Sequence, residues 1–302
     1  MRIRVLGSAA GGGFPQWNCG CPNCRGLRAG TLKAIPRTQE SVAVSCDGEH
    51  WVLLNASPEI RQQIESFPPL HPKKPRHSPI AAIVLTNGDL DHCLGLLSLR
   101  ENHPLTVHAT DRVRRGFTEG NVLYRTLERF DGQLTWRALK LGREDELASG
   151  LTVEAVPVPG KLPIHLEASS APDAEDSVGV RIRETGRGTV LAYFSGVGGV
   201  TPAVAQALED ADAVFFDGTF WSEDELPALG VGDKRARDMA HAPLGGPHGS
   251  LAALGALRAS RRILIHLNNT NPVLLEHSPE RAAVIAAGIQ VGFDGLAFEA
   301  DR

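Results

Sequence analysis

The chain has 302 residues, and its 31 lysines and arginines against 35 aspartates and glutamates give a formal net charge of −4. Such a mildly acidic chain lacks the basic face that neutralises nucleic-acid phosphates, so a general nucleic-acid partner is excluded. No run of about 20 apolar residues occurs, so no membrane span is expected. The apolar run at the N-terminus is too short for a signal peptide, and we expect a cytoplasmic protein.

Short segments rich in β-branched and apolar residues, each bounded by Gly, Pro, Asn or Asp, predict many strands. The predicted strands, in chain order, are Arg2–Leu6, Ser41–Cys46, His50–Leu54, Ile80–Leu85, Leu105–His108, Leu134–Leu139, Leu151–Val158, Val178–Arg183, Thr189–Phe194, Ala213–Phe216 and Arg262–Ile265. The proline-rich stretch 67–79 is interpreted as a loop within one domain, so residues 1–302 are predicted to form a single domain.

Fewer segments carry helix signals. Three begin with a Ser or Thr that can cap a helix, followed by proline in the first turn. The predicted helices are 57–66, 91–100, 201–208, 250–258 and 278–287. Strand runs followed by helices, in two similar halves, favour two mixed sheets packed face to face with helices outside. A doubly wound parallel sheet is the competing fold, but it predicts stricter alternation than the segment 134–194 shows.

The strongest chemical signal is the run Thr86-Asn87-Gly88-Asp89-Leu90-Asp91-His92, between a buried strand and a helix. Polar side chains at alternate positions of a tight turn converge on one point. Carboxylates at Asp89 and Asp91 and the imidazole of His92 are suitable ligands for a first-row divalent metal. The alternative is that Asp89 or Asp91 only caps the helix and opposes its dipole.

A second polar cluster follows the apolar strand that ends at Ile265. His266 comes next, and Asn268, Asn269 and Asn271 follow within five residues. A single histidine at a strand end is usually structural. Functional loops concentrate at such strand ends, so this cluster is a candidate functional site.

Three of the five cysteines, Cys19, Cys21 and Cys24, fall within six residues. In a reducing compartment this spacing predicts a metal site rather than a disulfide framework. Three thiolates can hold one zinc ion and leave a fourth position for a distant ligand. The alternative is a set of reduced, buried cysteines, but the flanking Gly20 and Pro22 favour the tight loop that chelation needs.

A further candidate is His241, in a loop rich in glycine, proline and histidine that continues to His248. Histidine titrates near neutral pH, so His241 is a candidate catalytic acid or base. A surface histidine without a function is an equally good interpretation of this segment alone.

Together these segments resemble the metallo-β-lactamase superfamily, whose central motif is His-x-His-x-Asp-His. Asn87 and Asp89 stand where the first two histidines belong, Asp91-His92 is kept, and the final histidine of the family matches His266. The next histidine of the family motif would fall near 160–161, where this chain has none. The aspartate that bridges the two metals in the family would fall in 193–196, where this chain has no aspartate. The resemblance implies an α/β (α+β) fold, an αββα sandwich of two mixed sheets with outer helices, in which the usual two-zinc site is largely dismantled.

The chain is also similar, from end to end, to the coenzyme pyrroloquinoline quinone (PQQ) biosynthesis protein B family. The segments that carry this resemblance are 7–19, 55–64, 87–92, 217–221 and 265–272. The resemblance implies a role in making PQQ, namely oxygenation of the tyrosine-derived ring of an excised, cross-linked Glu-Tyr intermediate. An older view of the family is transport of PQQ or its precursor towards the periplasm. The implied partners are this small molecule and other PQQ biosynthesis proteins.

The residue chemistry favours an oxygenase. Asp91, His92 and His266 form the two-histidine, one-carboxylate set typical of non-haem Fe(II) oxygenases, with Asp89 as an extra ligand or neighbour. A dinuclear zinc hydrolase needs more ligands than remain, and a carrier needs no metal ligands. His241 lies where relatives of this fold place a proton-donating histidine, so His241 and Asp89 are the predicted catalytic groups.

Further residues are expected to shape the two sites. Asn268, Asn269, Gly11 and Gly12 are predicted to line the substrate pocket, because backbone amides of a glycine-rich turn bind carboxylates. Related proteins place the fourth zinc ligand at a histidine that is Asn269 here. An amide is a poor zinc ligand, so His241, His248 or a water are the alternatives for that fourth position.

Overall fold

The computed structural model describes residues 1–167 and 171–301, and its strands there form two seven-stranded sheets. In the first sheet, β1, β2 and β3 pair antiparallel and β3 to β6 pair parallel. The spatial order is β14 (Ala297–Glu299), β1 (Arg2–Gly7), β2 (Ser41–Ser45), β3 (Trp51–Leu54), β4 (Ile80–Val84), β5 (Leu105–Ala109) and β6 (Leu134–Ala138).

The second sheet has the same mixed character. Its strands β7 to β10 pair antiparallel, and β10 to β13 pair parallel. The spatial order is β13 (Gln290–Val291), β12 (Arg261–Ile265), β11 (Ala213–Asp217), β10 (Val190–Phe194), β9 (Val178–Glu184), β8 (Leu151–Pro157) and β7 (Glu144–Glu146). Two mixed sheets exclude the doubly wound parallel sheet.

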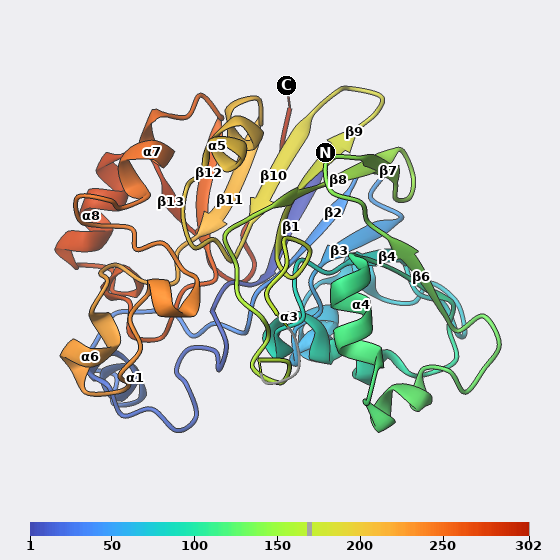
Figure 1. Cartoon of the computed structure of the whole chain (residues 1–302), viewed down its shortest axis with the longest axis horizontal. Coiled ribbons are helices and arrows are strands. Elements are labelled where there is room, and N and C mark those ends of the chain that lie inside the picture. Colours follow the sequence, from blue (N-terminus) through green and yellow to red (C-terminus); the bar gives the residue numbers. More distant parts are fainter. Residues whose placement is uncertain (168–170, 302) are drawn as a thin grey trace.

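Helices cover the outer faces of both sheets (Figure 1). The helices on the first sheet are α2 (Ile60–Glu65), α3 (Leu90–Cys93) and α4 (Asp111–Thr118). Those on the second sheet are α5 (Pro202–Glu209), α7 (Leu251–Ala256) and α8 (Pro279–Ala286). Two further helices, α1 (Pro22–Arg28) and α6 (Glu225–Leu229), lie at the lower left of Figure 1. In the part of the chain that the structure describes, no helix has both the length and the apolarity to cross a bilayer.

The strands are apolar on both faces because each sheet packs against the other sheet on one face and against helices on the other. In β10, Leu191 and Tyr193 point into the core between the sheets, whereas Ala192 and Phe194 point into the core under α5, α7 and α8. Three buried clusters result, one between the sheets and one under each outer layer. The predicted αββα metallo-β-lactamase-like sandwich is confirmed, and the single domain 1–302 stays a prediction.

Each predicted strand is present, with ends shifted by a few residues, but two predicted helices are wrong in detail. The helix expected from Ser57 begins at Ile60, because the Ser57 hydroxyl donates to Gln63 instead of capping the first turn. The helix expected over 91–100 is one α-helical turn, α3, followed by a 3-10 helix over Leu94–Leu99. Three strands were not predicted, since β7, β13 and β14 are at most three residues long.

Candidate metal centre

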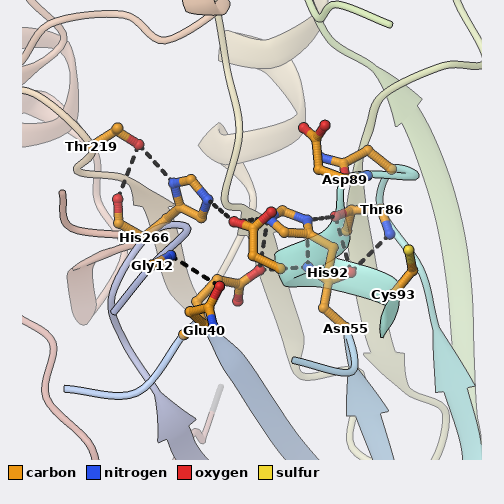
Figure 2. Close-up of polar contacts among 12 residues, drawn as sticks. Gly12, Glu40, Asn55, Thr86, Asp89, His92, Cys93, Thr219 and His266 are labelled. Carbon is orange, nitrogen blue, oxygen red and sulfur yellow. Dashed lines mark hydrogen bonds and ion pairs between the residues drawn. The ribbon is translucent and has the colours of Figure 1, made fainter. Parts of the chain in front are cut away.

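Two loops meet at one edge of the sandwich, one after β4 and one after β12 (Figure 2). Asp91, His92 and His266 each present a ligand atom there, and these atoms all lie within 4.8 Å of one another. Asp91 Oδ2 is 3.1 Å from His266 Nε2 and 3.6 Å from His92 Nε2. The structure therefore brings together three of the four residues predicted as ligands of this metal, although Asp91 and His266 are 175 positions apart in the chain.

The imidazole of His92 is fixed on one side and free on the other. Its Nδ1 lies 3.1 Å from Thr86 Oγ1, which can accept the ring hydrogen, and 3.1 Å from Asn55 Nδ2. Its Nε2 is buried and has no hydrogen-bond partner among the described residues. Burial lowers the pKa of His92 to about 4, so the ring is neutral near pH 7. A neutral, buried imidazole with one unpartnered nitrogen fits a metal ligand.

His266 is held by a hydrogen-bonded chain behind its ring. Thr219 Oγ1 lies 2.7 Å from His266 Nδ1 and donates to Asp217 Oδ1 at 2.6 Å. The Nδ1 hydrogen is thereby directed to Thr219, and Nε2 faces Asp91. Burial alone lowers the pKa of His266, but the hydrogen bond to Asp91 and the nearby carboxylates raise it to about 9.

The carboxyl group of Asp91 is the most charge-stabilised in this cluster. Burial alone would raise its pKa, but the neighbouring His92 and the hydrogen-bonded His266 hold the pKa of Asp91 well below its usual range. Gly11 packs directly on this group, since a Cβ at Gly11 would lie 3.4 Å from Asp91 Oδ2. Asp91 is therefore an anion near neutral pH, as a metal ligand must be.

Asp217, which ends β11, has no assigned role in the sequence analysis but is central here. Its Oδ2 lies 2.6 Å from His241 Nδ1 and accepts from Val197 N at 2.8 Å, and its Oδ1 accepts from Thr219 N at 2.9 Å. Burial alone raises the pKa of Asp217, but the charge and hydrogen bond of His241 lower it overall. The His241 ring also stacks on that of His266, with centroids 5.1 Å apart.

A signal for Asp217 was available in the sequence. β11 and β12 are parallel neighbours in which Asp217 pairs with Ile265, next to His266. Because the carboxyl ends of parallel strands meet at one edge of a sheet, a polar residue that ends a buried strand is a candidate for the same site as its neighbour.

The other predicted site residues surround this cluster. Asp89 occupies the N-cap position of α3, but its side chain makes no capping bond, which counts against the capping interpretation. Figure 2 draws no hydrogen bond or ion pair between its carboxylate and His92 or His266, and burial together with the charge of Asp91 raises its pKa. The Gly12 amide already donates to Gln39 Oε1 at 3.0 Å, and the Asn268 amide nitrogen donates to Thr270. The roles assigned to these residues stay predictions.

A buried carboxylate that the sequence analysis did not single out lies beside the cluster. Glu40 is fully buried and accepts hydrogen bonds from Asn55 Nδ2 and the Tyr193 hydroxyl. Its Oε1 is 3.6 Å from His92 Nε2. Burial raises the pKa of Glu40 to about 7.

The second predicted site is also assembled. The sulfurs of Cys19, Cys21 and Cys24 lie within 4.8 Å of one another, and none of them forms a disulfide. The side-chain amide nitrogen of Asn269 is 3.2, 3.5 and 3.4 Å from these sulfurs, respectively. His241, an alternative for the fourth position, is hydrogen-bonded to Asp217 instead.

The thiols differ in their ease of ionisation. Burial raises the pKa of Cys24 to about 11. Burial also acts on Cys21, but hydrogen bonds from the Cys24 backbone and from Cys19 outweigh it and lower its pKa. Both belong to α1 or its cap, since the Cys21 sulfur accepts from Cys24 N at the helix start. One thiol is thus prepared to ionise first.

Residues 50–267 match the family model described as Beta-lactamase superfamily domain. The chain is 45% identical over 300 residues to Coenzyme PQQ synthesis protein B of Ectopseudomonas mendocina (strain ymp), covering 98% of this chain and 99% of the relative. It is 44% identical over 308 residues to the protein of the same name from Pseudomonas putida (strain GB-1), covering 99% and 100%. The chain belongs to the PqqB family.

Solved structures agree with this membership. The crystal structure of Zn²⁺-bound PqqB from Methylobacterium extorquens is 44% identical, has a TM-score of 0.93, and is matched over 99% of this chain and 100% of that one. A diphosphatase from the PhnP family is 24% identical, with a TM-score of 0.66 over 99% of this chain and 97% of its own, and shares the fold alone. Both the resemblance and the fold expected from the sequence are confirmed.

Proposed function

We propose that this protein acts in PQQ biosynthesis as a metal-dependent oxygenase that hydroxylates the tyrosine-derived ring of an excised, cross-linked Glu-Tyr intermediate in the bacterial cytoplasm. Membership of the PqqB family supports the pathway. The observation that carries the chemistry is the unpartnered Nε2 of His92, which faces the same space as Asp91 Oδ2 and His266 Nε2. Two imidazoles and a carboxylate are the protein ligands of non-haem Fe(II) oxygenases.

A bound Fe(II) would supply the redox chemistry that makes oxygen reactive towards the ring. In the overall balance, one oxygen atom of O₂ enters a ring C–H bond and the other leaves as water. The two protons and two electrons that this requires come from a small-molecule reductant such as an enediol or a thiol. The protein residues hold the metal and place the ring, and the proposal assigns no redox change to them.

Asp217 and His241 are the proposed proton-handling pair. Since His241 Nδ1 donates to Asp217, the ring is held in one tautomer and its Nε2 remains available for proton exchange with a phenolic hydroxyl. Asp89, whose pKa is raised by burial and by the charge of Asp91, is the other predicted catalytic carboxyl group. Asn268 and the Gly11–Gly12 turn complete the proposed pocket walls.

A dinuclear hydrolase is less well supported. Asp217, His241 and His266 form a second group of ligand atoms within 4.8 Å. However, both oxygens of Asp217 already accept hydrogen bonds from the chain, from Val197 N and His241 on one side and from Thr219 on the other. Only the first group holds an unpartnered donor, so the site favours one metal. A carrier of PQQ has no need of such a group.

We also propose that Cys19, Cys21 and Cys24 hold a structural zinc ion. Three thiolates whose sulfurs lie within 4.8 Å of one another are typical zinc ligands, and the related Methylobacterium extorquens protein is described as Zn²⁺-bound. The carboxamide of Asn269 takes the fourth position, since its nitrogen and oxygen are interchangeable by a half-turn of the side-chain amide.

The test compares His92→Ala and His266→Ala with the wild type. Iron content after anaerobic loading and oxygen consumption with a tyrosine-containing substrate are measured for each. We expect both variants to lose iron and activity, whereas His103→Ala, which alters a histidine outside the site, keeps both. Full activity in both site variants contradicts the oxygenase and favours the carrier.

A further inference from the structure

The space between the two sheets is apolar over most of its width but becomes polar at the end where the edge strands β6 and β7 lie, on the right in Figure 1. In β4, Ala82 and Val84 face this space. The residue of β5 that pairs with Val84 is His108, and paired residues of neighbouring strands project to the same face of a sheet. The chain therefore places an imidazole where β4 places aliphatic side chains.

His108 is only 4% exposed, and neither of its ring nitrogens has a hydrogen-bond partner among the described residues. Asp145 pairs with Val153 of the core between the sheets, so its carboxylate projects from β7 into the same space. Its Oδ1 accepts from Arg143 Nε at 2.9 Å, whereas its Oδ2 is buried and has no partner in the described part of the chain. Since buried polar atoms in proteins are nearly always hydrogen-bonded, these unpartnered atoms indicate that a bound molecule completes the site.

Both residues line a pocket of about 550 Å³, with β5 and β6 on one side and β7 with its flanking residues on the other. Small-molecule sites commonly have volumes of about 300–1,000 Å³. One water molecule occupies roughly 30 Å³ in the liquid, so a single bound water would leave most of this pocket unfilled. The lining residues all differ from those of the metal centre and of the cysteine group, so this is a separate site.

The two walls of the pocket carry opposite charges. Arg137 of β6 pairs with His108 in the sheet, and its guanidinium makes no ion pair among the described residues, so it can receive an anion. Asp145 Oδ2 on the other wall can accept from a donor. Burial lowers the pKa of His108 to about 4, with smaller opposing effects of Asp145 and Arg137, so the ring is neutral near pH 7 and offers one donor and one acceptor.

We propose that this pocket binds a small carboxylic acid that carries an amino or hydroxyl group on the carbon next to the carboxylate. The carboxylate pairs with Arg137 and accepts from the N–H of His108, and the amino or hydroxyl group donates to Asp145 Oδ2. Because the charges of Arg137 and Asp145 both act on the one imidazole, the two groups of the ligand must lie close together. This inference depends neither on the metal nor on the reaction of the proposed function.

Alanine, lactate and propionate are the probes, because they share one carbon skeleton and differ only in the group next to the carboxylate. Binding to the wild-type protein is measured by calorimetric titration and by saturation-transfer NMR. We expect alanine or lactate to bind about tenfold or more tightly than propionate, which lacks the donor. The order of alanine and lactate then distinguishes an amino acid from a hydroxy acid.

Variants on both walls test the assigned contacts. Arg137→Gln alters an exposed side chain that is no part of the metal centre, and we expect it to weaken binding of the preferred acid about tenfold or more. Asp145→Asn replaces the free acceptor with an amide and should abolish the preference over propionate. Arg258→Gln, at an exposed arginine outside the pocket, is the control and should bind as the wild type does.

A crystal structure of the wild-type protein with the preferred acid keeps the inference testable if Asp145→Asn does not fold. We expect a ligand carboxylate oxygen about 2.7–2.9 Å from the Arg137 guanidinium. Equal affinity for the three probes, wild-type affinity in Arg137→Gln, no measurable binding of alanine and lactate, or only water in the pocket overturns the inference. Each of these results leaves the proposed function intact.

Discussion

The two predicted metal sites flank a single turn, since β12 ends at Ile265 and the next residues supply His266 to one site and Asn269 to the other. The first site gathers nitrogen and oxygen donors and leaves His92 Nε2 without a partner. The second gathers three sulfurs and fills the space between them with the chain's own carboxamide. Structural zinc sites are closed and catalytic ones keep an open position, so this contrast separates the two roles.

The supporting hydrogen bonds differ in the same way. Behind the first site, Thr219 and Asp217 hold His266, and Thr86 holds His92, so each imidazole is oriented without being closed off. At the second site, the Asn23 amide donates to the backbone carbonyls of residues 269, 270 and 271 and fixes the loop that carries the fourth position. This difference supports an open site in the first case and a closed one in the second, as the two proposed roles require.

Cys21→Ser is expected to have the largest effect. Removing one thiolate should abolish zinc binding and lower the free energy of unfolding by more than about 4 kcal/mol, since structural zinc contributes folding energy. Zinc stoichiometry and denaturant unfolding measure this. Cys46→Ser, at a half-buried cysteine outside the group, is the control and should retain zinc. An unchanged zinc content in Cys21→Ser ends the assignment of this site.

Asp217→Asn tests the orienting hydrogen bonds of the first site. Loss of the charge that fixes the His241 tautomer should reduce kcat on the order of 10- to 100-fold, with iron content unchanged. Turnover and bound iron are measured on the same samples. Equal activity in variant and wild type removes the proton-handling pair from the proposal.

The first site should be the more sensitive to pH between 6 and 9. The raised pKa of His266, about 9, means that a proton occupies the metal-free ring at pH 7. A metal must displace that proton, so affinity should rise about tenfold per pH unit up to about 9 and then level off. Co(II) titrations at pH 6, 7 and 8 measure the slope. A flat profile shows that His266 is not a ligand.

The same shift predicts a stability change in the metal-free protein. Because the folded pKa of His266 exceeds its usual value of 6.5, the folded state binds more protons between pH 6.5 and about 9. This contribution is fully present below pH 6.5 and is lost as pH rises through about 9. Denaturant unfolding of metal-free wild type and His266→Asn at pH 6.5 and 9 checks the sign, and the variant should lose less stability over this range.

Asn269→Ala is expected to have the smallest effect. The three thiolates remain, so zinc should stay bound, with an affinity about tenfold weaker, and the unfolding free energy should fall by about 1–2 kcal/mol through the lost amide contacts. A chelator competition assay and thermal unfolding give both values. Zinc affinity equal to that of the wild type shows that the carboxamide only packs against the sulfurs.

Local sequence patterns were enough to predict the strands of four or more residues and the groups that lie close together in the chain. Asp91 and His92 are adjacent, and the three cysteines fall within six residues, so their proximity needed no knowledge of the fold. Asp217 and Glu40 could not be placed in this way. Asp217 reaches the cluster through the pairing of β11 with β12, and Glu40 reaches it through side-chain contacts with residues 15 to 153 positions away.

Burial explains the remaining differences. Nothing in the sequence distinguishes Glu40 from the exposed glutamates, because its isolation from lysine and arginine arises only when the sheets close around it. The start predicted at 57 and the α-helix predicted over 91–100 differ from the structure for a related reason. Ser57 has a tertiary partner in Gln63, and the chain after Cys93 tightens into a 3-10 helix.

The backbone of His266 has a φ of 57°, a left-handed conformation that costs a residue with a Cβ roughly 1–3 kcal/mol. This bend directs the side chains of His266 and Asn269 to separate centres although only three positions divide them. The turn therefore positions one residue of each site, and a change in its backbone at one end alters the geometry of the site at the other. By thermodynamic reciprocity, any effect of metal binding at the sulfur site on affinity at the other site is matched by an equal effect in the reverse direction.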